Sequence, residues 1–224
     1  MYVGNVMRTE LVTVPPETTL LAAQDLLDQK QINHLLVVDG EGELLGIVSD
    51  RDLKKSWASS ATTLSKNELM YLLDQVTVFS IMTKKTIAIT PGTTIERAAL
   101  LMNQHRINAL PVLDGKALVG IITSSDVIKI LLEAIGIDKD SARLTVLVKD
   151  RIGVIADISK ALREDGINLR SLFTWPEQNH PGVYYLVIRV PASVGENAAA
   201  RLEKEGFKVI SHYAKDLSPY LPGG

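Results

Sequence analysis

The chain has 224 residues, 46% of them hydrophobic, which is enough to build the cores of two or three compact units. A formal net charge of -2 argues against a general nucleic-acid binder, and the absence of cysteine excludes disulfides, thiolate catalysis and cysteine-ligated metal sites. The first residues lack the basic and apolar segments of a signal peptide, and no apolar run approaches the roughly 20 residues of a membrane helix. We therefore expect a soluble cytoplasmic protein that binds neither nucleic acid nor membrane.

The first half of the chain contains two copies of one pattern. The segment GIVSDRD at 46–52 returns as GIITSSD at 120–126. The second copy is shorter in the turn between its two central strands, where a change of length costs least. Two related units are therefore expected, over residues 1–58 and 78–135.

Both copies predict the same order of elements. Apolar residues recur at helical spacing over 20–27 and over 95–102. A short strand precedes each helix, at 12–14 and 87–89, and two apolar strands joined by a Gly/Asp turn follow it. The Ser/Thr-x-x-Asp segment then opens a last helix. Each copy is thus a β-α-β-β-α unit whose open sheet face favours packing against the other copy.

Residues 59–77 connect the two copies. The stretch Ser59–Thr63 is typical of a loop, and Ser65 with Glu68 has the spacing of a capping box. We expect a connecting helix after this box.

The third part of the chain, residues 136–217, has a different pattern, and residues 218–224 are typical of a flexible tail. Alternating apolar residues predict strands, and Gly166 is expected to stop the first helix. The resulting order βαββαβ is that of a ferredoxin-like sandwich. The expected elements are a strand over 144–148, a helix ending at Gly166, strands over 167–175 and 183–190, a helix over 192–205 and a strand over 207–213.

The repeated segment combines three residue types that suit a nucleotide. Glycine allows a ligand or another backbone to come close. A hydroxyl and the free N–H groups of a helix start can hold a phosphate, and an ionised aspartate can accept both hydroxyls of a ribose. The alternative is that the segment only caps a helix, for which Ser49, Asp50, Thr123 and Ser124 are suitable residues.

Residues 1–135 resemble a tandem pair of cystathionine-β-synthase (CBS) domains, because each copy closes with the Gly-apolar-apolar-Ser/Thr-x-x-Asp segment. In that family two copies pair across their sheets, and the pair often binds adenine nucleotides (AMP, ADP or ATP) in two clefts built from both copies. One departure is Leu36, which stands where the second copy has Pro111, a residue common there in the family.

The resemblance implies the residues of both clefts. One cleft would use Leu11, Thr13, Ile32, Asn33 and His34 with Thr123, Ser125 and Asp126. The other would use Thr86, Ala88, Ile107, Asn108 and Ala109 with Ser49, Arg51 and Asp52. In each, the aspartate would take the ribose hydroxyls and the hydroxyl side chain the phosphate.

The residue before each aspartate predicts a difference between the clefts. Arg51 offers a permanent charge and a fork of donors, whereas Ser125 offers a weak neutral donor. We expect the cleft with Asp52 to favour the more highly phosphorylated nucleotide. The alternative is that Arg51 pairs with Asp50 or another carboxylate at the surface.

Residues 142–214 resemble an ACT domain, a regulatory module that usually binds amino acids, and are similar to it over Leu147–Ile155 and Gly166–Asn168. The glycine would open the backbone at a helix start, where N–H groups can meet a carboxylate. Ile152 stands where the family often has proline. A packing turn without a ligand is the alternative. The resemblance implies an amino-acid site at Asp150, Arg151, Gly153, Val154 and Asn168.

The domain order resembles the acetoin-utilisation protein B group. We expect a non-catalytic regulator that needs no cofactor, binds an adenine nucleotide and an amino acid, and acts on a partner protein. An enzyme of acetoin or acetate metabolism and a ligand-free scaffold are the alternatives. We also expect a homodimer, with apolar surface from helix residues such as Val127, Ile130 and Leu131. A metal site is not expected, because the histidines lack ligand spacing: His34, His105, His180 and His212.

Overall fold

The computed structural model describes residues 1–60, 74–137 and 140–223, and the chain forms two compact units, Met1–Ile128 and Lys129–Gly224. The expected capping box at Ser65 and Glu68 lies outside the described residues. Within the described segments, no helix has both the length and the apolar character needed to cross a membrane.

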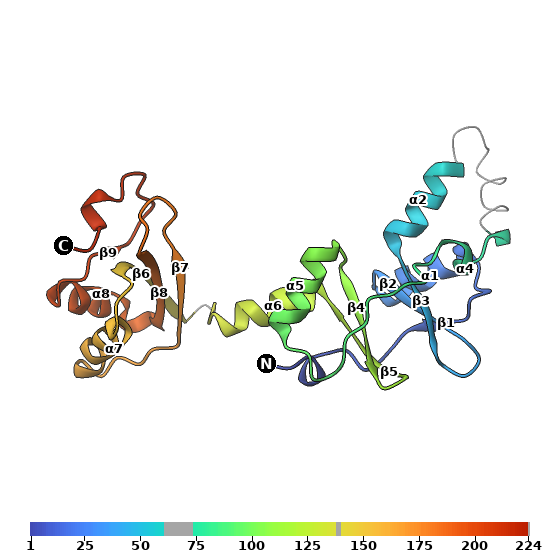
Figure 1. The fold of residues 1–224 in the computed structure, drawn as a ribbon, viewed down its shortest axis with the longest axis horizontal. Helices are drawn as coiled ribbons and strands as arrows, with labels where there is room; N and C mark the ends of the chain where they lie inside the picture. Colours follow the sequence, from blue (N-terminus) through green and yellow to red (C-terminus); the bar gives the residue numbers. More distant parts are fainter. Residues whose placement is uncertain (61–73, 138–139, 224) are drawn as a thin grey trace. The chain divides into compact units, whose positions relative to one another are not determined.

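The first repeat is a three-stranded sheet with two helices (Figure 1). Its elements are β1 (Thr13–Val14), α1 (Leu20–Lys30), β2 (His34–Val38), β3 (Leu44–Ser49) and α2 (Asp50–Ser60). The central strand β2 runs parallel to β1 and antiparallel to β3. The hydroxyl of Thr19 accepts a hydrogen bond from the Ala22 amide (3.2 Å) and so starts α1, which ends at Gln31 in the left-handed region (φ 52°).

The second repeat follows the same plan. Its elements are α4 (Val78–Ile81), α5 (Ile95–His105), β4 (Ala109–Asp114), β5 (Ala117–Thr123) and α6 (Ser124–Ala134). Helix α5 is capped by Thr94 and ends at Arg106 with φ 55°, as α1 is at the equivalent residues. The short strand expected at 87–89 is reduced to one bridge, between Ile89 and Val112. Val127 and Ile130 are 3% and 9% exposed, so the expectation that they offer free apolar surface is wrong.

The segment before each repeat's strands contacts the opposite repeat. Residues 1–8 pack on the second repeat and residues 76–83 on the first, and we call them the exchanged segments. Backbone hydrogen bonds join Arg8 to Ile121 of β5 in both directions (2.9 and 3.0 Å). The equivalent pair, Thr83 and Ile47 of β3, is joined in the same way (2.9 and 3.2 Å). Figure 1 shows the N-terminal segment passing the second repeat before it enters β1. Each repeat therefore completes the strand edge of the other.

Each exchanged segment also packs on the helix start of the opposite repeat. The Val3 amide donates to the Thr93 carbonyl (2.8 Å), just before α5. The Leu20 amide, at the start of α1, donates to the Val76 carbonyl (2.9 Å). Met1–Ile128 is thus one interlocked unit rather than two independent domains.

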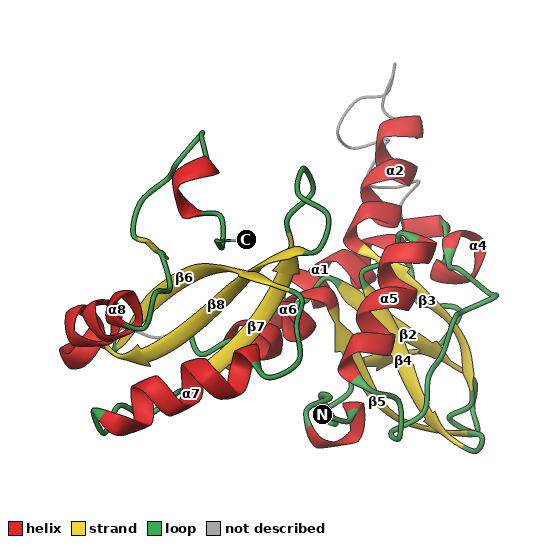
Figure 2. Ribbon diagram, turned by 60° about the vertical axis from the view of Figure 1, so that its left-hand side comes forward, coloured by secondary structure: helices red, strands yellow, loops and turns green. Residues whose placement is uncertain are grey.

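The second unit is a four-stranded antiparallel sheet with two helices (Figure 2). Its elements are β6 (Ser141–Lys149), α7 (Val154–Glu164), β7 (Ser171–Pro176), β8 (Val183–Pro191), η2 (Ala192–Val194), α8 (Gly195–Lys204), β9 (Val209–Ile210) and η3 (Ser218–Tyr220). The strand order is β7-β8-β6-β9. Alternate residues of β6 and β8 form one core with Ile158 and Leu162 of α7 and Leu202 of α8. The order βαββαβ is confirmed.

Candidate functional site: two repeated helix starts

The repeated segment forms a reciprocal cap at the start of α2 and again at the start of α6. In the first repeat the Ser49 amide and hydroxyl both donate to Oδ2 of Asp52 (2.9 and 2.6 Å), and the Asp52 amide donates back to the Ser49 hydroxyl (3.3 Å). Thr123 and Asp126 repeat this arrangement, with distances of 3.0, 2.6 and 3.3 Å. The capping function of the segment is therefore real, and it fixes each carboxylate by one oxygen.

The glycine of each segment makes room for a methionine of the opposite repeat. A Cβ on Gly46 would come within 2.8 Å of the sulfur of Met82 and 2.9 Å of the Thr83 carbonyl oxygen. A Cβ on Gly120 would overlap the sulfur of Met7. Close approach was the expected reason for these glycines. The approaching group is a methionine side chain at both glycines, and at Gly46 also the backbone carbonyl of Thr83.

The second oxygen of each aspartate has different surroundings. Oδ1 of Asp126 accepts hydrogen bonds from Nη2 (2.8 Å) and Nε (3.3 Å) of Arg8. Partial burial acts to raise the pKa of Asp126, but hydrogen bonds from Arg8 and Thr123 outweigh it and hold the pKa below its usual value. Oδ1 of Asp52 accepts no hydrogen bond from any residue that the structure describes. Sequence reasoning missed Arg8, because it lies far from the motif along the chain.

Neighbouring residues lie against the cap of their own repeat. His34 of β2 is directly opposite Ser49 of β3, and the Asn33 carbonyl accepts the Asp50 amide (3.1 Å). Burial lowers the pKa of His34 below its usual value, while the nearby Asp52 carboxylate opposes this. The structure therefore places His34 beside Asp52, whereas the family resemblance assigned it to the cleft of Asp126.

In the second repeat Ala109 is opposite Thr123, and the Asn108 carbonyl accepts the Ser124 amide (2.9 Å). Arg51 and Ser125 are exposed at the helix starts. Among the described residues Arg51 has no ion pair, and the neighbouring Asp50 pairs with Lys54 (2.7 Å). The remaining expected site residues are exposed or partly buried: Leu11, Thr13, Ile32, Thr86, Ala88 and Ile107.

The glycine of the second unit lies at an open loop before α7. Gly153 has φ 89°, is exposed, and a Cβ there would meet nothing within 4 Å. Arg151 is tied to Asp157 of α7 (2.6 Å), and the Asp150 amide donates to the Gly182 carbonyl (2.8 Å). Ile152 is fully exposed. Of the other two expected residues, Val154 is partly buried and Asn168 is exposed.

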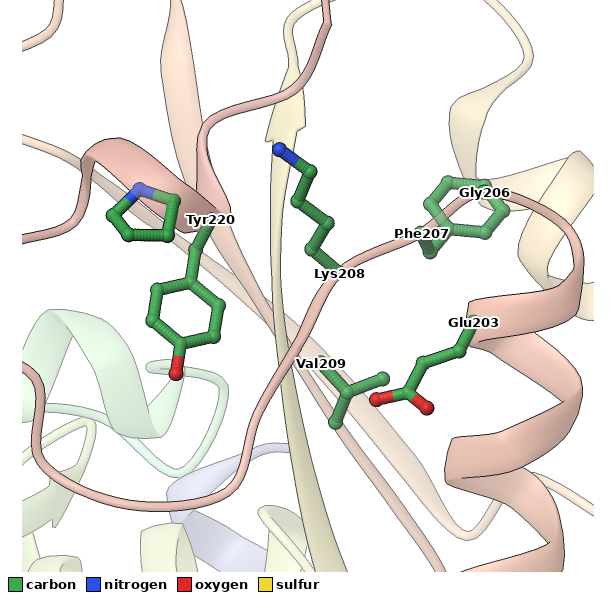
Figure 3. Close-up of a pocket in the computed structure, with 7 residues that line it drawn as sticks. Glu203, Gly206, Phe207, Lys208, Val209 and Tyr220 are labelled. Carbon is green, nitrogen blue, oxygen red and sulfur yellow. The ribbon is translucent and has the colours of Figure 1, made fainter.

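Figure 3 shows a depression in the second unit that sequence reasoning did not predict. Its volume is about 440 Å³, and it lies between the end of α8, β9 and η3. The Lys208 ammonium donates to the Leu221 carbonyl (3.2 Å), and the rings of His212 and Tyr220 meet edge to face at 6.5 Å. The residues Ser218–Tyr220, which belong to the tail that the sequence predicts to be flexible, form η3 and close one side of the depression. The lining residues are Glu203, Gly206, Phe207, Lys208, Val209, Pro219 and Tyr220.

Comparison with known proteins agrees with this architecture. A CBS domain-containing protein of Dictyostelium discoideum is 34% identical over 136 residues, which are 60% of this chain and 94% of that protein. The inosine-5′-monophosphate dehydrogenase of Nitrosopumilus maritimus is 30% identical over 125 residues, 55% of this chain. The chain spans only 23% of that enzyme's length.

Two solved structures resemble the first unit. One is a Vibrio cholerae protein named for acetoin utilisation (AcuB), with a TM-score of 0.50 and 32% identity over 59% of this chain and 91% of that one. The other is the CBS domain pair of protein MJ0100 in complex with 5′-methylthioadenosine and S-adenosyl-L-methionine, with a TM-score of 0.50 and 26% identity over 58% and 95% of the chains.

The CBS domain family matches residues 3–59 and 78–133, and the ACT domain family matches residues 142–207. Both are regulatory, non-catalytic modules. The two matched stretches of the first family are the two interlocked repeats, and the third stretch is the βαββαβ unit. The chain therefore belongs to the CBS domain family and carries an ACT domain after its CBS pair.

Proposed function

We propose that the protein is a non-catalytic regulator that binds an adenosine-type ligand, with AMP, ADP or ATP as the expected forms, at the helix starts of its CBS pair. The proposal rests on the Oδ1 atom of Asp52, which is left available for a ligand. The cap holds this carboxylate in place by its other oxygen, and no described residue donates to Oδ1. An ionised oxygen in this position can accept a hydroxyl of a ribose.

The surroundings of this oxygen also support a nucleoside. His34 lies beside Asp52 with its pKa lowered by burial, so its imidazole is neutral at neutral pH and leaves the carboxylate charge uncompensated. Arg51 is exposed one residue before the aspartate, where its guanidinium can meet a phosphate. The structure of the related MJ0100 pair is a complex with two adenosine derivatives, which supports a ligand of this class here.

The test is calorimetric titration of the full chain with AMP, ADP, ATP and 5′-methylthioadenosine. We expect binding in the wild type and a loss of one site in Asp52→Asn. Asp50→Asn is the matched control, because it removes the same charge from the same helix start, but Asp50 is engaged with Lys54. A wild type that binds none of these ligands would reduce the CBS pair to a scaffold.

We propose an amino acid as the ligand of the ACT domain, at the loop of Asp150, Arg151 and Gly153. The open space over Gly153 and its position at the start of α7 favour contact between backbone N–H groups and a carboxylate. Arg151 is half-exposed in its pair with Asp157, so its guanidinium can turn toward such a ligand.

We propose that the protein acts as a homodimer on a partner protein, with a role in acetoin or acetate metabolism suggested by the AcuB relative. Leu100 of α5 and Ile128 of α6 are 44% and 57% exposed and offer apolar surface for assembly. Light scattering of the full chain is expected to give twice the 24.5 kDa of one chain. A monomer at micromolar concentration would contradict the dimer but not the ligand site.

A further inference from the structure

The two aspartates of the repeated segment differ in one ion pair. Arg8 and Thr83 occupy equivalent positions in the exchanged segments, since each is bonded through its backbone to a strand of the opposite repeat, Ile121 or Ile47. The guanidinium of Arg8 reaches Oδ1 of Asp126 at 2.8 Å. The short, uncharged side chain of Thr83 offers no such partner in the other repeat.

This ion pair uses the atom on which a ligand would depend. In both repeats the cap occupies Oδ2 of the aspartate, so Oδ1 is the oxygen left for a ribose hydroxyl. At Asp126 the guanidinium already holds Oδ1 through two nitrogens. At Asp52 the same oxygen has no donor among the described residues.

We propose that Arg8 is a latch on Asp126, which makes this aspartate the weaker of two ribose sites and lets the site of Asp52 fill first. The inference rests on the proposed function, because it assumes that both carboxylates bind ribose. A ligand at Asp126 has to displace the guanidinium or share the oxygen with it. The caps of the two repeats are alike, so the difference between the two ribose sites comes from the contact of Arg8 with Asp126.

The exposure of the pair sets the size of the effect. The Arg8 side chain is 55% exposed and that of Asp126 17%, so water replaces the guanidinium at small cost. Exposed ion pairs of this kind change an equilibrium by roughly two- to fivefold, and salt screens them. A displaced guanidinium keeps its positive charge, which favours a ligand that carries a phosphate. The latch therefore opposes an uncharged nucleoside more than a nucleotide.

The experiment isolates each site and then removes the latch. Asp52→Asn leaves the site of Asp126, and Asp126→Asn leaves the site of Asp52. Each variant is titrated with 5′-methylthioadenosine and with AMP by calorimetry, with and without Arg8→Thr, which copies Thr83. Lys116→Thr is the control for charge, because Lys116 pairs with Glu43 in the strand turns (3.4 Å). Arg8→Gln serves as a second variant, and thermal melts confirm that all variants fold.

We expect Arg8→Thr to tighten binding at the Asp126 site roughly two- to fivefold for 5′-methylthioadenosine and by less for AMP. The gain should shrink between 0.05 and about 0.5 M salt, and Arg8→Thr should leave the Asp52 site unchanged. Unchanged or weaker binding at the Asp126 site, for whichever ligand binds, would overturn the latch. If wild type binds neither ligand, the proposed function fails and the latch with it.

Discussion

The sulfur of Met82 lies over Gly46 so closely that a Cβ on residue 46 would approach it to 2.8 Å. The carbonyl oxygen of Thr83 would be 2.9 Å from the same Cβ. Met7 lies over Gly120 in the same way, but there the three nearest atoms all belong to the methionine side chain. Both glycines thus make room for a methionine, but only at Gly46 is a backbone atom among the three nearest.

We predict that Gly46→Ala destabilises the protein by about 1–3 kcal/mol, the usual cost of forcing extra volume into a packed site. Gly120→Ala is expected to cost less, because the Met7 side chain can rotate away whereas the Thr83 backbone cannot. Urea unfolding followed by circular dichroism measures both. Met7→Ala should recover most of the loss in Gly120→Ala, and equal losses in the two glycine variants would contradict this explanation.

A second prediction concerns acid stability. The pKa of Asp126 is below its usual value because hydrogen bonds from Arg8 and Thr123 outweigh the effect of burial. Its contribution to the free energy of unfolding is therefore present above the unfolded pKa of about 4, and it is lost as pH falls through the lower folded pKa.

Arg8→Thr should raise the pKa of Asp126 toward its unfolded value. The free energy of unfolding should then fall less between pH 6 and pH 3 than it does in the wild type. The measurement is an NMR titration of the side-chain carboxyl carbon, together with urea unfolding at pH 6 and pH 3. Lys116→Thr should leave the titration as it is. An unchanged pKa of Asp126 in Arg8→Thr would show that the ion pair does not persist in solution.

Arg51 should set the preference between nucleotides at the Asp52 site. A well-made hydrogen bond to a charged group contributes about 1.5–3 kcal/mol, so Arg51→Ala should weaken ATP binding by roughly ten- to hundredfold and AMP binding by less. Competing titrations with ATP and AMP measure the ratio. Lys55→Ala, at an exposed position of the same helix, is a control. A ratio unaltered in Arg51→Ala would reject the charge argument while leaving the site in place.

The ACT loop allows a fourth prediction. Gly153→Val should abolish any amino-acid binding that calorimetry with a panel of amino acids detects, because the side chain fills the open approach to the start of α7. The φ of 89° also strains any other residue there, so the melting temperature should fall. Ile152→Val, at an exposed neighbour, should preserve binding. Binding that survives Gly153→Val would place the ligand elsewhere.

Local patterns were sufficient to predict much of this protein. The helices over 20–27 and 95–102 and the caps at Ser49 and Thr123 depend on residues only a few positions apart in the chain. Because these signals are local, helix starts and the strand pairs of each repeat could be placed without coordinates.

Contacts between distant segments could not be predicted in the same way. Nothing adjacent to Gly120 in the sequence indicates Met7, and nothing near Asp126 indicates Arg8, since both come from the exchanged segment. The strand expected over 87–89 has a single bridge at Ile89. These features depend on contacts between residues far apart in the sequence. The periodic pattern of apolar residues within one segment carries no information about such contacts.

The crossed leading segments have a consequence for how the chain can be divided. A fragment cut between the two repeats would leave β3 or β5 with an unpaired edge at Ile47 or Ile121. It would also lose the methionine that covers the glycine of that strand. Such an edge readily recruits the missing strand from another molecule. Isolated halves are therefore expected to exchange these leading segments between molecules and to associate, so the two repeats behave as one folding unit.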